Sequence, residues 1–264
     1  MKKYFVIGNP INHSLSPKLH NYWLKENNID AIYDKKKIEE KNLQTIISEV
    51  KEKKINGINV TVPFKRSVIP YLDRLSPEAE QTQSVNTIIL SNDNLVGHNT
   101  DILGFDKAIK NLNFDMRGKK IFILGAGGVV PSIIFALNKM NVSKIIISNR
   151  TKEKAENLKS RFHNLDILEW GDINDFDVII NATSLGLNKE SLNLDFSKFT
   201  NNKLFYDVIY NPAETNFLKE GKKLGNRTEN GKLMFIYQAF EAFKLWHGIE
   251  PQINSDILEI LNND

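Results

Sequence analysis

The stretch Lys119-Lys120-Ile121-Phe122-Ile123-Leu124-Gly125-Ala126-Gly127-Gly128 decides the fold of this chain. A continuous apolar run that ends at Leu124 is typical of a strand buried on both faces. The glycines that follow at once allow the backbone to turn tightly and to approach a pyrophosphate at the start of a helix. We therefore predict a strand, then a dinucleotide-binding loop at Gly125, Ala126, Gly127 and Gly128, then a helix over 129–140.

This loop departs from the common Gly-x-Gly-x-x-Gly pattern, because Val130 stands where the third glycine is usual. A glycine-rich turn alone is weak evidence, and an ordinary loop is the alternative interpretation. The position between a buried strand and a helix favours cofactor binding, because the helix N-terminus stabilises a phosphate charge.

Further apolar runs follow the loop and alternate with helical patterns. We expect strands over 144–148, 177–181 and 204–208, and a helix over 152–162. Strands that alternate with helices, each strand buried on both faces, predict a doubly wound parallel sheet of the Rossmann-like kind.

The first hundred residues predict a different α/β arrangement, a mixed sheet with helices. Strands are expected over 4–7, 31–33 and 57–62, and a hairpin over 85–90 and 95–96. Helices are expected from Ser16-Pro17, with Ser16 as the N-cap, and over 43–50. The predicted domains are therefore 1–102 and 103–235. Periodicity alone leaves open which of them the last helices, over 232–246 and 255–261, pack against.

Cofactor choice is indicated at the end of the second strand of the parallel sheet. NAD sites usually carry an acidic residue at this place to bind the ribose hydroxyls. This chain has Asn149-Arg150-Thr151 instead, with Lys154 one turn further on. A guanidinium and a hydroxyl can bind a ribose 2′-phosphate, so we predict NADP. The alternative is a solvated strand-end charge at Arg150 and a helix N-cap at Thr151.

The segment from Asn59 to Lys65 carries polar side chains into a buried strand. With a strand period of two, Asn59 and Thr61 share one face, while Val60 and Val62 are expected to enter the core. Two polar groups on a buried face need partners, which a polyhydroxylated ligand would supply. Lys65 is expected in the first turn of a helix, where the dipole would disfavour its charge. A lone lysine there is more often a surface residue.

Short hydroxyl and carboxylate side chains mark two helix starts. Ser14 and Ser16 form a pair of hydroxyls suited to a carboxylate, or are a turn residue and an N-cap. Thr100 and Asp101 start another helix, and either of them could be only its cap. We leave both alternatives open from the residues alone.

Two buried-looking amides and three histidines complete the candidate polar residues. Asn86 opens a strand, and Gln238 lies among apolar residues; either could bind a ligand or satisfy buried backbone. His13, His20 and His98 do not have the spacing of metal ligands, so we expect structural roles for them and no metal site.

Composition excludes several functional classes. The 264 residues are 41% hydrophobic and 25% charged, an ordinary globular balance. The net charge is +3, and the lysines are spread along the chain, which favours a small anionic ligand over nucleic acid or a membrane surface. The absence of cysteine excludes disulfides and thiol chemistry. We find no signal peptide or membrane-spanning segment, and we expect a cytoplasmic protein.

Taken together, the chain resembles the shikimate dehydrogenase family over nearly its whole length. Nine ordered segments carry this resemblance: Gly8-Asn9-Pro10-Ile11-Asn12-His13-Ser14-Leu15-Ser16-Pro17, Asn59 through Lys65, Val85-Asn86-Thr87, Gly97-His98-Asn99-Thr100-Asp101, Gly125 through Gly128, Asn149-Arg150-Thr151, Asn181-Ala182-Thr183-Ser184-Leu185-Gly186, Asp207-Val208-Ile209-Tyr210-Asn211-Pro212, and Gly231-Lys232-Leu233-Met234 followed by Gln238.

The resemblance implies NADP-dependent, reversible reduction of 3-dehydroshikimate to shikimate, in the biosynthesis of chorismate and aromatic amino acids. It implies that Lys65 and Asp101 are the catalytic pair. It also implies that the C-terminal helices, 236–264, return to the first domain. The substrate-binding residues it implies are Ser14, Ser16 and Tyr210 for the carboxylate and Asn59, Thr61, Asn86 and Gln238 for the ring hydroxyls. The cofactor-binding residues it implies are Ala126, Gly127, Gly128, Val129, Asn149, Arg150, Thr151, Lys154 and Gly231.

Three alternatives to this reading differ at particular residues. A quinate/shikimate dehydrogenase of broader substrate and cofactor use tends to carry an acidic residue where this chain has Thr151. A non-catalytic NADP-binding sensor should have lost Lys65 or Asp101, and both are present. The folate dehydrogenases lack the combination of serines, Asn59, Thr61 and Lys65. The expected partners are therefore small molecules, and the expected assembly is a monomer or a homodimer.

Overall fold

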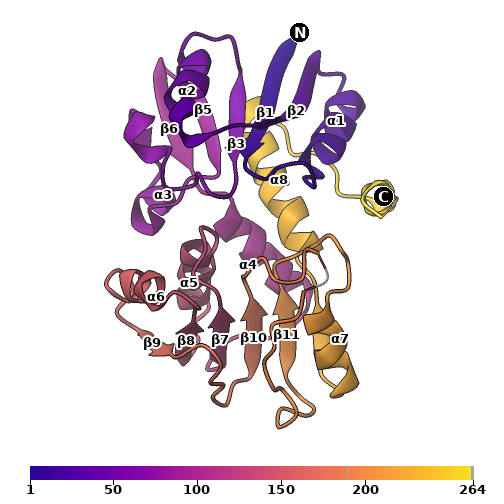
Figure 1. Ribbon diagram of the computed structural model, residues 1–264. Coiled ribbons are helices and arrows are strands. Elements are labelled where there is room, and N and C mark those ends of the chain that lie inside the picture. The colour runs from indigo at the N-terminus through magenta and orange to yellow at the C-terminus, as the bar shows by residue number, and fades with distance from the viewer. Residues whose placement is uncertain (189, 263–264) are drawn as a thin grey trace. The chain divides into compact units, whose positions relative to one another are not determined.

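The computed structural model describes residues 1–188 and 190–262, and the chain divides into two compact units. Unit 1 comprises Met1–Gly104 together with the segment that begins at Ile236, and unit 2 comprises Phe105–Phe235. Both units are α/β, and their elements are labelled in Figure 1. Within the described ranges, no helix is long and apolar enough to cross a membrane.

Unit 1 is built on a six-stranded mixed sheet with the strand order β2-β1-β3-β5-β6-β4. β1 pairs in parallel with β2 and β3, β5 is antiparallel to both β3 and β6, and β4 is parallel to β6. Its elements in chain order are β1 (Lys2–Gly8), α1 (Ser16–Glu26), β2 (Ala31–Lys37), a 3₁₀ turn (Glu40–Asn42), α2 (Leu43–Lys51), β3 (Gly57–Val60), a 3₁₀ turn (Ile69–Tyr71), β4 (Arg74–Leu75), α3 (Pro77–Thr82), β5 (Thr87–Ser91), β6 (Asn94–His98) and α9 (Ser255–Ile260). Two helices are shared between the units: α4 (Asp101–Asn111) begins in unit 1 and ends in unit 2, and α8 (Lys232–His247) begins in unit 2 and ends in unit 1.

Apolar residues at sheet and helix periods form the core of unit 1. The buried face of α2, with Leu43, Ile46, Ile47 and Val50, packs against the sheet in one hydrophobic cluster. Another part of the core of unit 1 is aromatic. There, Trp246 of α8 donates its indole N–H to Ile88 O at 3.1 Å. This contact fixes α8 to the middle of the sheet.

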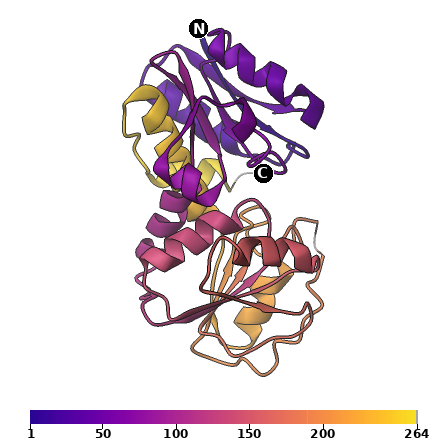
Figure 2. The same ribbon diagram turned by 90° about the vertical axis from the view of Figure 1, so that its left-hand side faces the viewer.

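Unit 2 is a six-stranded sheet in the order β12-β11-β10-β7-β8-β9, in which every pair is parallel. Its elements are β7 (Lys120–Leu124), α5 (Val130–Lys139), β8 (Lys144–Ser148), α6 (Lys152–Lys159), β9 (Leu165–Leu168), β10 (Val178–Asn181), β11 (Leu204–Asp207), α7 (Asn216–Lys223) and β12 (Arg227–Glu229). Figure 1 labels its central strands, and Figure 2 shows the same ribbon turned by 90°.

The strand order of unit 2 reverses between β7 and β10. From β7 the chain winds outward through β8 to β9, and it then returns to β10 on the other side of β7. Open parallel sheets bind ligands beyond the carboxyl ends of the strands at such a switch point. The fold therefore directs attention to the residues that follow Leu124 and Asn181.

The structure confirms the predicted fold class, a mixed sheet followed by a doubly wound parallel sheet. It corrects one strand: β3 ends at Val60, and Val62 is 55% exposed instead of entering the core. The reason is that the chain turns from Val62 onward, so the side chain of Val62 no longer follows the alternation of the strand. The elements missed by sequence reasoning are β4, α3, β9, α7 and β12.

Candidate functional site

The polar residues of unit 1 gather at one edge of its sheet. β1, β3 and β6 run in the same direction and end at this edge, while the antiparallel β5 begins there. Lys65 therefore follows β3, Asn86 immediately precedes β5, and Asp101 follows β6. The order and direction of the strands therefore bring Lys65, Asn86 and Asp101, which are distant in sequence, to the same edge of the sheet.

Lys65 and Asp101 form a buried ion pair at this edge. Lys65 Nζ lies 2.5 Å from Asp101 Oδ2, and their side chains are only 10% and 7% exposed. Asp101 is the first residue of α4, where the helix dipole stabilises a carboxylate. Its backbone N–H donates to Asn99 Oδ1 at 3.1 Å, which fixes the start of that helix. A buried charge pair of this kind costs desolvation energy, so it is more often kept for function than for stability.

Asn86 holds the second oxygen of that carboxylate. Its Nδ2 donates to Asp101 Oδ1 at 3.0 Å and to Thr100 Oγ1 at 2.9 Å, and it lies 3.4 Å from Gln238 Oε1. The backbone N–H of Thr100 donates in return to Asn86 Oδ1 at 2.8 Å. An amide nitrogen has only two N–H groups for these three acceptors, so the longest contact, to Gln238 of α8, is the one a ligand can replace at least cost.

Asn59 is buried beside the same group. Its Nδ2 donates to Asn86 O at 3.1 Å and to Thr87 Oγ1 at 3.0 Å, while its Oδ1 accepts the hydroxyl of Tyr33 at 2.6 Å. Sequence reasoning singled out Asn59 but missed Tyr33, because β2 carries mostly exposed residues around it. No pattern in β2 would have revealed this contact.

Ser14 and Thr61 lie on the loops that follow β1 and β3, and Ser16 begins α1 at the end of the first of these loops. These loops run together: the N–H of Asn9 donates to Val62 O at 3.0 Å. A Cβ atom at Gly8 would meet the Thr61 methyl group at 2.6 Å, so the close approach of the two loops requires glycine there. Both loops therefore begin at the same edge of the sheet as the segment that carries Lys65.

Two sequence-based expectations about these loops are wrong. Ser16 is the first residue of α1 and makes no side-chain cap; the hydroxyl of Ser14 accepts its N–H at 3.3 Å instead. Lys65 lies in a turn and not in the first turn of a helix. Its carbonyl accepts the N–H of Val85 at 2.8 Å, which ties this turn to the residues just before β5. The helix-dipole argument for Lys65 therefore does not hold.

The loop after β7 in unit 2 has the shape of a phosphate-binding turn. Gly125 has φ +105°, and a Cβ atom there would lie 2.8 Å from Ala182 O. Both the conformation and the space require glycine. The N-cap position of α5 is Val129, whose side chain makes no capping hydrogen bond. The helix N-terminus thus lacks a side-chain cap at the switch point, where an anionic ligand can take its place. Gly127 and Gly128 are exposed, and Ala126 is half-buried.

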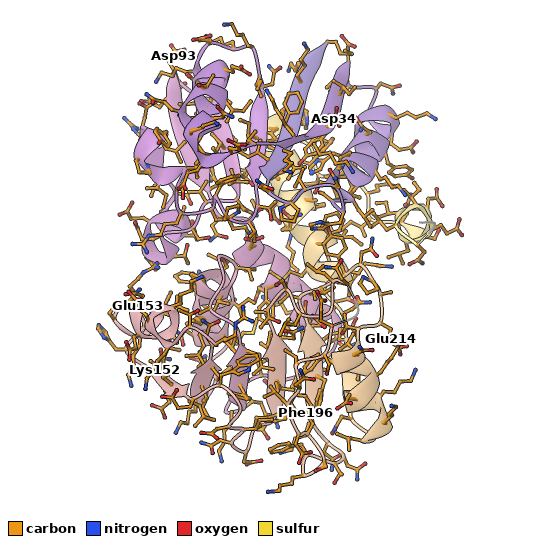
Figure 3. All side chains as sticks on the ribbon, viewed as in Figure 1. Asp34, Asp93, Lys152, Glu153, Phe196 and Glu214 are labelled. Atoms are coloured by element: carbon orange, nitrogen blue, oxygen red, sulfur yellow. The ribbon has the colours of Figure 1, made fainter. Side chains whose placement is uncertain are left out.

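The residues expected to recognise a ribose phosphate follow β8. Arg150, Thr151 and Lys154 are exposed, and the side-chain amide of Asn149 donates to Thr151 O at 2.7 Å, which fixes this turn. Thr151 occupies the N-cap position of α6 without a side-chain cap. Lys152, the first residue of α6, is labelled in Figure 3 and is paired with Glu169 at the surface. The chemistry of this exposed cationic turn fits a phosphate group.

Gly231 and Tyr210 also belong to unit 2. A Cβ atom at Gly231 would lie 2.0 Å from Val208 O, so only glycine fits immediately before α8. The ring of Tyr210 stacks on Phe235, with centroids 4.3 Å apart.

Sequence reasoning missed a buried carboxylate at the end of β11. Asp207 accepts the hydroxyl of Thr215 at 2.5 Å, Asn181 Nδ2 at 3.1 Å and the N–H of Ile209 at 3.0 Å. Burial raises its pKa to about 6, against the lowering effect of those three donors. The group ties the ends of β10 and β11 to the start of α7. The Asn181 and Asp207 motifs were visible in the sequence, but their pairing depends on the register of two strands.

Known protein families match this chain along most of its length. A family model described as the shikimate dehydrogenase substrate binding domain matches residues 6–88, and one described as shikimate / quinate 5-dehydrogenase matches residues 106–207. A third, described as the shikimate 5′-dehydrogenase C-terminal domain, matches residues 233–254.

Individual proteins give the same result. The shikimate dehydrogenase (NADP(+)) of Pelagibacter ubique is 52% identical over 264 residues, covering 99% of this chain and all of that protein. The crystal structure of shikimate dehydrogenase from Aquifex aeolicus is similar with a TM-score of 0.91 at 36% identity, covering 100% of this chain and 98% of that one. The Thermus thermophilus enzyme, in complex with NADP(H) and shikimate, has a TM-score of 0.90 at 30% identity and 99% coverage of both chains.

Proposed function

This chain belongs to the shikimate dehydrogenase family, and from that premise we infer that it is an NADP-dependent oxidoreductase that interconverts 3-dehydroshikimate and shikimate. The observation that carries the proposal is the buried pair of Lys65 and Asp101, 2.5 Å apart beside Asn86 and Asn59. A buried ammonium among amides and hydroxyls suits the reduction of a polyhydroxylated ketone, because the product alkoxide needs a proton.

Lys65 is the proposed proton donor. Its ammonium group has three N–H bonds, and the contact with Asp101 needs only one of them. When NADPH is bound, it supplies the hydride that reduces the ketone carbon. Lys65 then gives a proton to the developing alkoxide, and Asp101 holds the ammonium in place through an oxygen that Asn86 does not occupy. In the oxidative direction, neutral Lys65 takes the hydroxyl proton.

The remaining polar groups of unit 1 are proposed to hold the substrate. Asn59, Thr61, Asn86 and Gln238 would bind ring hydroxyls, and Ser14 and Ser16 would bind the carboxylate. Tyr210, which belongs to unit 2, stays a proposed further contact for the carboxylate. What supports this is the position of the loops from unit 1 at the sheet edge that carries Lys65. Unit 1 is the proposed substrate-binding domain.

Unit 2 is the proposed NADP-binding domain. The Gly125–Val129 loop would hold the pyrophosphate, and Gly231 would be a further dinucleotide contact. Asn149, Arg150, Thr151 and Lys154 would hold the adenine ribose with its 2′-phosphate. The support is the strained glycine turn at the switch point and the exposed cations that follow β8. Because NADPH is a cytoplasmic reductant, we also propose a cytoplasmic enzyme that works as a monomer or a homodimer.

The proton-transfer pair is tested by removing each member. We expect Lys65→Ala and Asp101→Ala each to reduce turnover by at least about 100-fold, because a positioned acid contributes this much. The double variant should be little worse than either single variant, because the two residues act as one unit. Steady-state turnover of shikimate measures this, with NADP binding followed by fluorescence to show that the fold survives.

A matched control is available in the exposed pair of Lys51 and Asp73, which are 2.6 Å apart in the same unit. Lys51→Ala should leave turnover near the wild-type value, because exposed pairs contribute little. Near-normal turnover of Lys65→Ala would refute the proposed role. Losses that multiply in the double variant would show that the two residues do separate work.

A further inference from the structure

Tyr33 of β2 makes a buried hydrogen bond to a residue of the proposed substrate site. Its hydroxyl donates to Asn59 Oδ1 at 2.6 Å, and the two residues are 2% and 6% exposed. Tyr33 is separated from Asn59 by β1 in the sheet, because the strand order is β2-β1-β3. The long tyrosine side chain therefore reaches across one strand to touch a single amide oxygen.

The orientation of the Asn59 amide follows from its other partners. Nδ2 donates to Asn86 O at 3.1 Å and to Thr87 Oγ1 at 3.0 Å. A backbone carbonyl can only accept, so Nδ2 must face Asn86 O and Oδ1 must face Tyr33. Both N–H groups are then used inside the protein. Towards a ligand, Asn59 can offer only the second lone pair of Oδ1, which accepts a hydrogen bond.

Two residues of α1 and one of α8 fix the position of Tyr33. The side-chain amide of Asn21 makes two hydrogen bonds to the backbone of Tyr33: its oxygen accepts the N–H of Tyr33 at 2.9 Å, and its nitrogen donates to the carbonyl of Tyr33 at 2.7 Å. The imidazole of His20 stacks on the tyrosine ring, with centroids 4.2 Å apart and planes within 4°. Trp246 lies 6.1 Å from the same ring on another side. The position of the hydroxyl is therefore set by packing from two helices.

His20 contributes to this stack as a neutral ring. Burial, and secondarily the charge of His247, lower the pKa of His20 to about 3. Its Nε2 has no hydrogen-bond partner among the described residues, and besides Tyr33 its ring lies near Trp23, Phe243 and Trp246. A neutral imidazole lies flat on a phenol ring without the cost of a buried charge.

We propose that Tyr33 is a positioning residue for substrate recognition, whose hydroxyl holds Asn59 Oδ1 as the acceptor for one ring hydroxyl of shikimate. This inference rests on the proposed function, in which Asn59 binds a ring hydroxyl. Tyr33 acts through Asn59 and does not touch the reacting atoms. It sets the direction of one substrate hydrogen bond and thereby favours a ligand with a hydroxyl donor at that place.

The test is a kinetic cycle of four proteins: wild type, Tyr33→Phe, Asn59→Ala and the double variant. Loss of one neutral hydrogen bond should raise the KM for shikimate about 3- to 10-fold in Tyr33→Phe. The kcat and the KM for NADP should stay near the wild-type values, because proton transfer and cofactor binding use other residues. In the Asn59→Ala background, Tyr33→Phe should change the KM by less than about twofold.

Tyr4 provides the matched control. It faces Tyr33 in the register of β1 and β2, is 3% exposed, and its ring lies 5.0 Å from Trp246. Tyr4→Phe should leave the KM for shikimate within about twofold of wild type. Three results would each overturn the proposal: an unchanged KM in Tyr33→Phe, the same loss in the Asn59→Ala background, or an equal loss in Tyr4→Phe.

A measurement on the wild-type protein covers the case in which Tyr33→Phe does not fold. The measurement is NMR spectroscopy of protein that carries ¹⁵N-labelled asparagine. The Nδ2 protons of Asn59 should exchange with solvent more slowly than those of the exposed Asn28. Addition of shikimate should change the chemical shift of the Tyr33 hydroxyl proton. An unshifted hydroxyl proton at saturating shikimate overturns the proposal. Turnover of shikimate by the wild-type protein tests the proposed function separately. No turnover would contradict the proposed function. Turnover by the wild type, together with a KM for shikimate that is unchanged in Tyr33→Phe, would contradict only the role of Tyr33.

Discussion

Arg150 is the residue that decides cofactor selectivity in this account. It is exposed after β8, where a guanidinium can bind the 2′-phosphate of NADP, which NAD lacks. Arg150→Ala should therefore raise the KM for NADP by about 10- to 150-fold, the range for a charge-assisted contact. Activity with NAD should be nearly unchanged. Steady-state kinetics with both cofactors measure the difference.

Arg117 serves as the control for that change. It is also exposed in unit 2 but precedes β7, so it lies at the opposite edge of the sheet from Arg150. Arg117→Ala should leave both KM values unchanged. Equal losses with NADP and NAD in Arg150→Ala would mean that Arg150 supports the local structure and does not recognise the phosphate.

Individual side chains show where sequence reasoning works and where it stops. Asn59 was singled out because polar residues on a buried strand are conspicuous, and the structure finds it buried with three hydrogen-bond partners. Its partner Tyr33 gave no signal, because that contact spans a strand and depends on sheet order. Lys65 was expected on a helix but lies in a turn, and its carbonyl accepts the N–H of Val85, a residue 20 positions away.

At the scale of elements, local signals predict strands better than helix starts. The run at 144–148 was predicted with the same bounds as β8, because four of its five residues are buried and the flanking residues are polar. The hairpin of β5 and β6 was also predicted, and Asn92 and Asp93 turn there with φ +47° and +58°. Such strands need no information from the rest of the chain.

How a helix starts depends on neighbouring residues, which a Ser-Pro pair in the sequence does not reveal. Ser76-Pro77 and Ser16-Pro17 look alike, yet only the hydroxyl of Ser76 caps its helix, by accepting Ala79 N–H at 3.2 Å. At α1 the preceding Ser14 takes over and accepts the N–H of Ser16. Edge strands are also poorly signalled: β12 is Arg-Thr-Glu, without a buried residue. Polar edge strands form because a neighbouring strand offers unpaired backbone groups.

For the whole molecule, the buried histidine of unit 1 links stability to pH. The pKa of His20 falls from 6.5 in a free side chain to about 3 in the fold. Below pH 6.5 the unfolded chain therefore binds a proton that the folded chain does not, and the free energy of unfolding decreases as the pH falls towards 3. When the pH falls from 7 to 5, the free energy of unfolding should therefore decrease by roughly 2 kcal/mol less in His20→Phe than in the wild-type protein.

Urea unfolding at the two pH values measures this, followed by the fluorescence of Trp23 and Trp246, whose rings lie 5.8 and 5.6 Å from His20. The exposed His163 gives the control, since His163→Phe should follow the wild-type pH dependence. Asp207, with its pKa raised to about 6, acts in the opposite sense in all three proteins. Parallel pH dependence of wild type and His20→Phe would contradict the assignment.

The central claim is that this chain oxidises shikimate with NADP, and one assay tests it most directly. Wild-type protein is given shikimate or quinate, each with NADP or NAD, and the formation of reduced nicotinamide is followed by absorbance. The account predicts the highest kcat/KM for shikimate with NADP, and a preference for NADP over NAD of at least about 10-fold, as expected from one charge-assisted phosphate contact. A higher kcat/KM with quinate, equal use of NAD, or no turnover of either substrate would contradict it.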